Sequence, residues 1–220
     1  LAPPGESGDR DQRTANLIAA LSAQPPERLV YISTSGVYGD CGGAWVDEDR
    51  PVAPQTQRGA RRVDAERALL AWGRQSGVAV AVLRVPGIYA AERLPLAQLK
   101  RGAPVLRAED DVYTNHIHAE DLAAICSTAL ERGAAGRIYN ASDDSEMKMG
   151  DYFDLVADRA GLPRPPRITR AAAEAGAISE GLLSFMRESR RLLNTRMKTE
   201  LGVRLRSPSV HEGVPPVVAA

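Results

Sequence analysis

The sequence predicts an α/β fold in which helices cover both faces of a parallel sheet. Residues 29–32 form a short apolar and β-branched run, as expected of a strand. Residues 78–85 are almost uninterruptedly aliphatic, which is typical of a parallel strand that is buried on both faces. Between these two runs, residues 56–77 have a helical pattern. A strand, a helix and a strand in this order predict a parallel βαβ unit.

The first predicted strand ends in hydroxyl-bearing residues. Ser33, Thr34 and Ser35 follow the apolar run and precede Gly36. In an open α/β sheet, ligands bind at the carboxyl ends of the strands, where the loops border a crevice. These hydroxyls are therefore candidates for contact with a ligand.

The remaining elements are predicted from periodicity and from Gly and Pro residues that end each pattern. The pattern predicts helices over residues 9–23, 94–100, 119–131 and 149–160, a strand over 136–142, and one or two helices over 178–201. Seven apolar side chains of the last segment are expected to be buried: Leu182, Leu183, Phe185, Met186, Leu192, Leu193 and Met197. Residues 207–220 are expected to form a loose tail.

Composition limits the classes of function. The chain has 220 residues, 44% of them hydrophobic, which is enough for one sizeable core and a small appendage. Lys and Arg number 28, as do Asp and Glu, so no field of one sign indicates nucleic acid or an anionic membrane as a partner. Two cysteines are too few for a disulfide framework, and a reducing cytoplasm is the expected compartment. No apolar run approaches the roughly 20 residues of a membrane span.

Two histidines raise the question of a metal. His116 and His118 are two residues apart, so on a strand they would share a face. No third ligand stands at a spacing typical of zinc sites. The sequence therefore predicts no metal site.

Three stretches carry a resemblance to a known family. Residues 31–39 (Tyr-Ile-Ser-Thr-Ser-Gly-Val-Tyr-Gly), 83–89 (Leu-Arg-Val-Pro-Gly-Ile-Tyr) and 115–123 (Asn-His-Ile-His-Ala-Glu-Asp-Leu-Ala) are similar to successive blocks of the extended short-chain dehydrogenase/reductase family. This family includes NAD-dependent epimerases and dehydratases that act on nucleotide sugars. The resemblance covers residues 1–142 and implies a Rossmann-type three-layer fold with NAD or NADP as cofactor. It also implies a small, mostly helical C-terminal subdomain on the substrate side.

The resemblance implies three segments. Residues 1–145 would belong to the NAD(P)-binding domain, with excursions to the substrate side, and residues 146–206 to the helical subdomain. Residues 207–220 would be the tail. The resemblance also favours a homodimer formed through the helix at residues 58–74 and the helix before the first strand.

The family's catalytic pair is altered. Thr34 matches the family's hydroxyl position, which orients the reacting oxygen. The family's Tyr-x-x-x-Lys is usually followed by a glutamate, and counting back from Glu66 places the lysine position at Arg62 and the tyrosine position at Arg58. Arginine stays protonated at physiological pH and cannot take a proton from a substrate hydroxyl. A guanidinium at residue 58 could instead clamp a phosphate or a carboxylate.

The resemblance also implies contacts to the cofactor. In the family, the loop after the second predicted strand passes its backbone along the nicotinamide ring. From local sequence alone, a simple strand-ending turn is the alternative interpretation of this loop. The cofactor-binding residues implied are Ser33, Thr34, Arg62, Pro86, Gly87 and Ile88.

The front of the sequence does not match a dinucleotide-binding domain. Such a domain starts with a strand, a Gly-rich turn and a helix whose N-terminus faces the pyrophosphate. Gly5 and Gly8 have the wrong spacing, and no strand precedes them, so we expect no such turn in this sequence. We expect a Rossmann domain that lacks its first βαβ units, through a fragment, a misplaced gene start or a true truncation.

Three hypotheses of function remain. The first is an NAD(P)-dependent epimerase, dehydratase or reductase that acts on a sugar nucleotide or a similar polyol. The second is a non-catalytic dinucleotide-binding or sensor module, in which the face of Arg58 and Arg62 contacts an anionic ligand. The third is a truncated product that folds poorly because a sheet edge is exposed. The sequence does not distinguish NAD from NADP.

Overall fold

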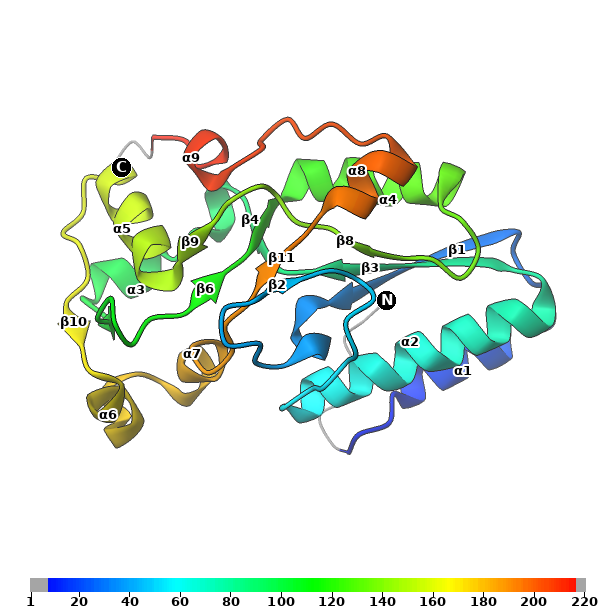
Figure 1. Cartoon of the computed structure of the whole chain (residues 1–220), viewed down its shortest axis with the longest axis horizontal. Helices are drawn as coiled ribbons and strands as arrows, with labels where there is room; N and C mark the ends of the chain where they lie inside the picture. The colour runs from blue at the N-terminus through cyan, green and yellow to red at the C-terminus, as the bar shows by residue number, and fades with distance from the viewer. Residues whose placement is uncertain (1–7, 217–220) are drawn as a thin grey trace.

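A parallel sheet forms the centre of the molecule. The computed structural model describes residues 8–216, and its main sheet has the strand order β1-β3-β8, with both pairs parallel. The strands are β1 (Arg28–Thr34), β3 (Ala79–Val85) and β8 (Ile138–Asn140). This architecture confirms the predicted α/β class with a parallel sheet (Figure 1).

Helices cover both faces of this sheet (Figure 1). On one face lie α1 (Gln12–Leu21) and α2 (Gln57–Ser76), which pack on Tyr31, Val80 and Val82 of the sheet. On the other face lie α4 (Ala119–Arg132) and α8 (Thr195–Leu201), which pack on Leu83 and Val85. Successive side chains of β1 and β3 point to opposite faces of the sheet, so each strand contributes to two hydrophobic cores, one on each face.

Local signals set the ends of α2. The Thr56 side chain accepts a hydrogen bond from the Gly59 amide at 3.1 Å and caps the first turn. The helix ends at Gly77, whose φ of 77° lies in the left-handed region that favours glycine. The predicted helix at 56–77 and the predicted strand at 78–85 therefore agree with α2 and β3 to within a residue.

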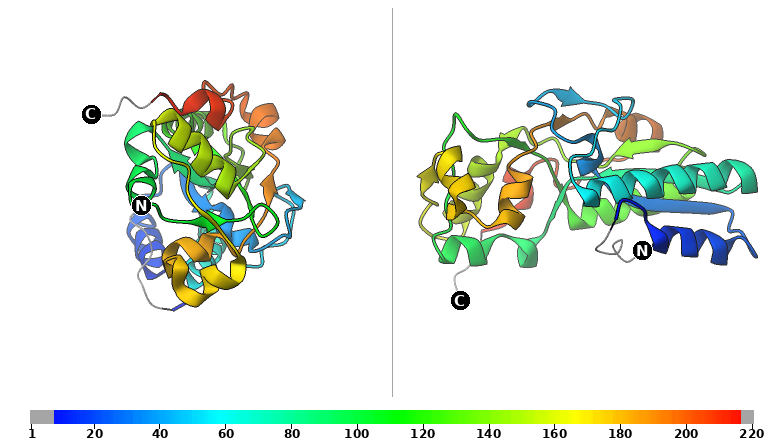
Figure 2. Two further views of the ribbon diagram at one scale, coloured as in Figure 1. Left: turned by 90° about the vertical axis from the view of Figure 1, so that its left-hand side faces the viewer. Right: turned by 90° about the horizontal axis from the view of Figure 1, so that it is seen from below.

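A second lobe lies beyond the carboxyl ends of the sheet strands (Figure 2). Its strands pair as β4 (Gly87–Tyr89) with β7 (His116–His118), β6 (Tyr113–Thr114) with β9 (Met147–Lys148), and β5 (Val105–Leu106) with β10 (Arg167–Ile168). Its helices and turns are η2 (Ala91–Arg93), α3 (Leu96–Lys100), α5 (Met149–Arg159), α6 (Arg170–Ala172), η3 (Ala173–Ala177), α7 (Glu180–Phe185) and α9 (Val210–Gly213). Between the lobes run η1 (Ser35–Tyr38) and the pair of β2 (Trp45–Val46) with β11 (Arg191–Leu192).

One helix departs from the predicted division at residue 145. The core of the second lobe contains Phe153 and Val156 from after that position, together with Leu99, Val105 and Leu106 from the part for which excursions to the substrate side were expected. Helix α8, which the prediction assigned to the substrate-side subdomain, packs instead on the main sheet. Each lobe therefore draws on separate stretches of the chain, which a cut at one position cannot reproduce.

The predicted loose tail is wrong for residues 207–216. Val210 and Val214 are 0% exposed and belong to the core of the second lobe. The amide of Val210 also donates to the Ser145 hydroxyl at 2.8 Å. Apolar burial therefore fixes this segment, whereas residues 217–220 lie outside the described residues.

The predicted stretch of one or two helices at 178–201 contains two, α7 and α8. Strand β11 separates α7 from α8 because it pairs with β2. Leu183, Met186, Leu192 and Met197 are buried as expected, and Leu182 is partly buried. Phe185 and Leu193 are 51% and 39% exposed, so their predicted burial is wrong.

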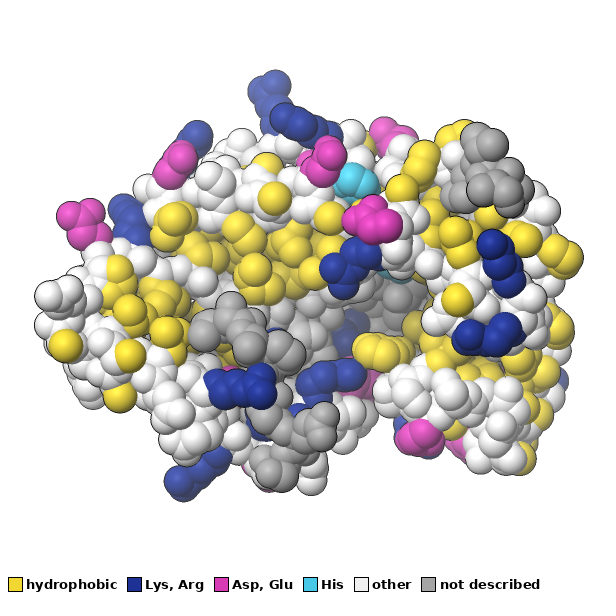
Figure 3. Space-filling view, turned by 180° about the vertical axis from the view of Figure 1, so that it is seen from behind, with side chains coloured by type: hydrophobic (Ala, Val, Ile, Leu, Met, Phe, Trp, Pro, Cys, Tyr) yellow, Lys and Arg dark blue, Asp and Glu magenta, His cyan; other side chains and the backbone are white. Residues whose placement is uncertain are grey.

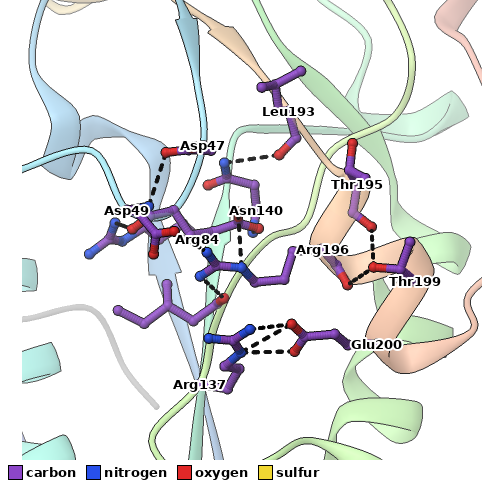
Figure 4. Close-up of polar contacts among 12 residues, drawn as sticks. Asp47, Asp49, Arg84, Arg137, Asn140, Leu193, Thr195, Arg196, Thr199 and Glu200 are labelled. Atoms are coloured by element: carbon purple, nitrogen blue, oxygen red, sulfur yellow. Dashed lines mark hydrogen bonds and ion pairs between the residues drawn. The ribbon is translucent and has the colours of Figure 1, made fainter.

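Asn140 joins the loops between the lobes to the sheet. Its side-chain oxygen accepts from the Tyr38 hydroxyl at 2.8 Å, and its side-chain nitrogen donates to the carbonyls of Val46 and Leu193 at 3.1 Å. Nearby, Arg196 of α8 contacts Asp49 (Figure 4). These bonds hold β2 and β11 beside the end of β8, because a buried amide must be paired.

Strand β1 lies at an edge of the sheet. Within residues 8–216 it pairs with β3 alone, and its Ile32 side chain is 44% exposed. Hydrophobic side chains gather on the face seen from behind (Figure 3). A hollow of about 340 Å³ is lined by Leu17, Leu21, Leu29, Val30, Ile32 and Arg62. The exposed sheet edge that the sequence predicts is therefore present in the described part of the chain. Among the helices of that part, none is long and apolar enough to cross a membrane.

Candidate functional site

A cleft of about 270 Å³ lies between the two lobes. On the sheet side it is bordered by the carboxyl ends of β1 and β3 and by the start of β7, and on the other side by α5 and α7. The lining residues are Thr34, Ser35, Gly36, Arg58, Pro86, Gly87, Tyr113, Thr114, Asn115, His116, Met149, Tyr152, Phe153, Leu182, Phe185, Glu188 and Arg190. Its position is the one at which open α/β sheets bind their ligands.

Five of the candidate site residues come together in this cleft. Thr34 ends β1, Ser35 follows it in η1, Pro86 and Gly87 follow β3, and Arg58 lies in the first turn of α2. The Thr34 hydroxyl accepts a hydrogen bond from the Gly36 amide at 3.2 Å, which fixes the turn after β1. Their roles toward a cofactor or substrate stay predictions.

The other predicted site residues do not line the cleft. Ser33 donates its hydroxyl to Glu66 at 2.5 Å inside the core, and Ile88 packs against the core beneath α4. Arg62 donates to the Tyr31 hydroxyl at 2.8 Å, with its guanidinium 5.6 Å from the centre of that ring. Arg62 therefore lies along the edge of β1 rather than beside Thr34, although the two were expected to share one site.

Arg58 contacts the opposite lobe. Its guanidinium carbon is 4.7 Å from the centre of the Phe185 ring on α7. A cation over an aromatic face is attracted by the ring's quadrupole. The residue at the family's tyrosine position thus links α2 to α7 at the cleft, where Phe185 is half exposed.

A second arginine in the cleft is neutralised locally. Arg190 lies 2.8 Å from a Glu188 carboxylate oxygen and donates to the Gly39 carbonyl at 2.6 Å. Its Nε is buried and has no hydrogen-bond partner among the described residues. The Nε–H of Arg190 therefore remains an unpaired donor in the wall of the cleft, and Glu188 balances the charge of this arginine.

His116 and Tyr152 line the cleft but were not predicted as site residues. The rings of His116 and Tyr152 stack at 4.2 Å between centroids, tilted by 30°. Burial lowers the pKa of His116 to about 3 and raises the pKa of Tyr152 to about 12, so both side chains are neutral at physiological pH. The helical pattern of residues 149–160 predicts the helix that carries Tyr152, and no local signal places this side chain against β7.

The glycine spacing of a dinucleotide-binding turn does occur at Gly36, Gly39 and Gly42, which corrects the expectation that it is absent. The structure shows no helix after it, because η1 leads into a loop and then β2. A Cβ on Gly39 would lie 2.2 Å from the Ala53 carbonyl oxygen, and φ there is 66°. This glycine therefore allows close backbone packing and does not open a phosphate-binding helix.

The two histidines that are two residues apart, His116 and His118, have separate environments. His116 faces the cleft, whereas His118 accepts a hydrogen bond from the Glu120 amide at 3.3 Å and caps α4. In the part of the chain that the structure describes, no three His, Cys, Asp or Glu side chains are grouped so as to hold a metal ion.

The chain is an α/β protein with a cleft at the carboxyl ends of parallel strands, where open α/β sheets bind ligands. Residues 11–142 match the model of the NAD dependent epimerase/dehydratase family. This match covers more than half of the chain, so the chain belongs to that family, as its three sequence blocks indicated.

Similar proteins include enzymes and a protein without a known activity. The chain is 29% identical over 179 residues to GDP-6-deoxy-D-mannose reductase from Pseudomonas aeruginosa. The aligned region covers 72% of this chain and 59% of that relative. A functionally unknown conserved protein from Silicibacter pomeroyi has a TM-score of 0.84 at 33% identity, over 96% of this chain and 73% of the other. The structure of RMD from Pseudomonas aeruginosa, complexed with NADPH, has a TM-score of 0.71 at 20% identity, over 93% and 70%. The last likeness supports the Rossmann-like fold.

Proposed function

We propose that this protein binds a sugar nucleotide in the cleft, beside the nicotinamide of NAD or NADP, without the tyrosine-dependent proton transfer of its family. Membership in an NAD dependent family supports the cofactor, and the sugar-nucleotide reductase among its relatives supports the ligand. The chain spans 59% of that relative's length, so the activity of the whole protein is part of the proposal.

The cleft chemistry suits such a ligand. Met149, Phe153 and Leu182 offer apolar walls for the faces of a sugar ring, and Arg58 offers a cation for a phosphate. Backbone at Pro86 and Gly87 is the place for the nicotinamide that the family resemblance implies. The described residues contain no Gly-rich turn that opens a helix, so this assignment is confined to the nicotinamide side of the cofactor.

The contact of Arg58 with Phe185 is the main observation that supports binding without catalysis. A phenol with a lowered pKa is the family's general base, and an arginine cannot replace it because its guanidinium stays protonated. Arg62, at the lysine position, is bonded to Tyr31 and is not a cleft residue. Neither half of the pair is present where the proton would be transferred.

Turnover as an NAD(P)-dependent epimerase or dehydratase is the second candidate. Thr34 and Gly87 in one cleft favour it, since they match the family's hydroxyl and nicotinamide positions. Tyr152 also brings a phenol to the cleft, but burial raises its pKa to about 12, which makes it a poor base near neutral pH.

Cofactor and ligand binding are measured together with turnover. NADH and NADPH are titrated by fluorescence, and thermal melts are recorded with and without UDP-glucose and GDP-mannose. A ligand at a hundredfold excess over its Kd adds about 2.7 kcal/mol of stability. We expect binding without any product from the wild type. Measurable turnover of either sugar nucleotide by the wild type would favour the second candidate, and no binding of any of these ligands would contradict both.

The variant pair R58Y/R62K tests the role of the two arginines. It restores the phenol and the ammonium of the family's motif, so we expect NAD-dependent conversion to rise above the wild-type background.

A homodimer through α1 and α2 is also proposed, on the family resemblance, and light scattering after size exclusion would measure it.

A further inference from the structure

Two neighbouring side chains of the cleft have polar atoms that no other described residue pairs. His116 is 5% exposed and Tyr152 is 8% exposed, and both line the cleft. Among residues 8–216, the buried Nδ1 of His116 has no hydrogen-bond partner. The Tyr152 hydroxyl forms no hydrogen bond within this part of the chain either. Because Nδ1 is sealed from solvent, Nε2 is the ring nitrogen left to meet a ligand.

Two other polar side chains of the cleft, Asn115 and Glu188, are paired within its walls. Asn115 donates to the Arg190 carbonyl at 2.9 Å and accepts from the Leu192 amide at 2.8 Å. Glu188 is paired with Arg190. These groups already have partners, so a ligand gains little from replacing them.

The His116–Tyr152 pair is held in place from several sides. The stacked rings lie 4.2 Å apart, and Tyr89 meets the His116 ring edge-on at 6.2 Å. His116 is opposite Gly87 in the β4–β7 register, and a Cβ on Gly87 would lie 3.5 Å from the His116 Cδ2. The pair therefore stands against the backbone that follows β3, with little freedom to turn away.

The chemistry of the pair fits an uncharged oxygen. Both groups are neutral near pH 7, because burial lowers the pKa of the imidazole to about 3 and raises that of the phenol to about 12. A hydroxyl can donate and accept, and a carbonyl can accept from the phenol, whereas a phosphate or carboxylate would lose its hydration here without a counter-charge. A buried polar group left unpaired costs about 1–3 kcal/mol, which a ligand oxygen would offset.

We infer that His116 and Tyr152 together recognise a hydroxyl or carbonyl oxygen on the uncharged end of the ligand. This inference rests on the proposed function and assigns the sugar end of a sugar nucleotide to α5 and β7. It makes the two residues determinants of specificity: a ligand that lacks this oxygen leaves both groups unpaired and binds less tightly.

Three single variants test the assignment by calorimetry with UDP-glucose and with UDP. Tyr152→Phe keeps the stacked ring and removes only the hydroxyl, and His116→Phe keeps a ring and removes both nitrogens. Tyr89→Phe is the matched control, because Tyr89 touches the His116 ring but donates its hydroxyl to the Ser209 carbonyl and does not line the cleft. Thermal melts of all variants establish that they are folded.

We expect Tyr152→Phe and His116→Phe each to weaken UDP-glucose by about tenfold, the effect of one lost hydrogen bond, while UDP is unchanged. Tyr89→Phe should stay within about twofold for both ligands. Equal effects on UDP-glucose and UDP, or no effect on either, would overturn the inference.

A crystal structure of the unliganded protein separates this inference from the proposed function. If the wild type binds neither UDP-glucose nor UDP, the proposed sugar-nucleotide function fails. Ordered water within hydrogen-bond distance of the Tyr152 hydroxyl and the His116 Nε2 would still support the pair as a polar recognition point. An empty site there, or protein partners for both atoms, would refute it.

Discussion

Removal of the Glu66 carboxylate should destabilise the protein strongly. Glu66 and Arg84 are 3% and 4% exposed, and the Glu66 carboxylate lies 2.8 Å from the Arg84 guanidinium. The same carboxylate accepts a hydrogen bond from the Ser33 hydroxyl at 2.5 Å. Glu66→Leu leaves a buried guanidinium without its counter-charge, and breaking a buried pair in this way costs about 3–5 kcal/mol. For a chain of this size, that corresponds to a fall in Tm of roughly 6–20 °C.

Urea unfolding followed by circular dichroism measures this loss. The double variant E66L/R84M removes both charges, so it should be closer to the wild type than E66L alone. Asp158→Asn is a control, because Asp158 pairs with Arg164 at the surface, and its unfolding midpoint should match that of the wild type. If E66L unfolds at the same urea concentration as D158N, Ser33, Glu66 and Arg84 do not form the structural unit described here.

Two further changes test the burial of Asp143 and of the C-terminal segment. Burial raises the pKa of Asp143 from 3.8 to about 7; between these values the folded state keeps a proton that the unfolded chain has lost, so this group lowers stability as pH rises. Asp143→Asn removes that contribution. The urea midpoint of the variant, compared with that of the wild type, should therefore rise from pH 4 to pH 7 and then level off. An equal difference in midpoint at pH 4 and at pH 8 would contradict the burial of this carboxyl. Truncation after Pro208 removes the fully buried Val210 and Val214 and should cost about 3–6 kcal/mol in urea unfolding; an unchanged midpoint would restore the view of a loose tail.

Much of the fold was predictable because its signals are local. Helix α2 begins at a Thr cap and ends at Gly77, and β3 is an aliphatic run, so their bounds could be read from the sequence. Strands β2 and β11 have two residues each, and their pairing joins positions 45 and 191. Such short, distant pairs carry no periodicity, and the tail buries two isolated valines, Val210 and Val214. Tertiary contacts decide these parts.

The candidate site was predictable only in part for a similar reason. Thr34 and Gly87 were found because each follows a recognisable strand. Arg62 could not be placed, since the Tyr31 hydroxyl draws it to the sheet edge. His116 and Tyr152 meet because β7 pairs with β4 and α5 packs behind it, and neither contact has a signal in the local sequence.

The most direct test is a calorimetric titration of UDP-glucose into the wild type and into Gly36→Leu. Gly36 lines the cleft, its φ is not positive, and a Cβ there would meet only ordinary contacts, the nearest at 3.5 Å from the Thr34 hydroxyl oxygen. The leucine should fold normally and fill the space that the ligand needs. We predict that the wild type binds and that G36L loses about 10- to 100-fold in affinity at an unchanged Tm. Equal binding by both proteins would contradict the assignment of the ligand to this cleft.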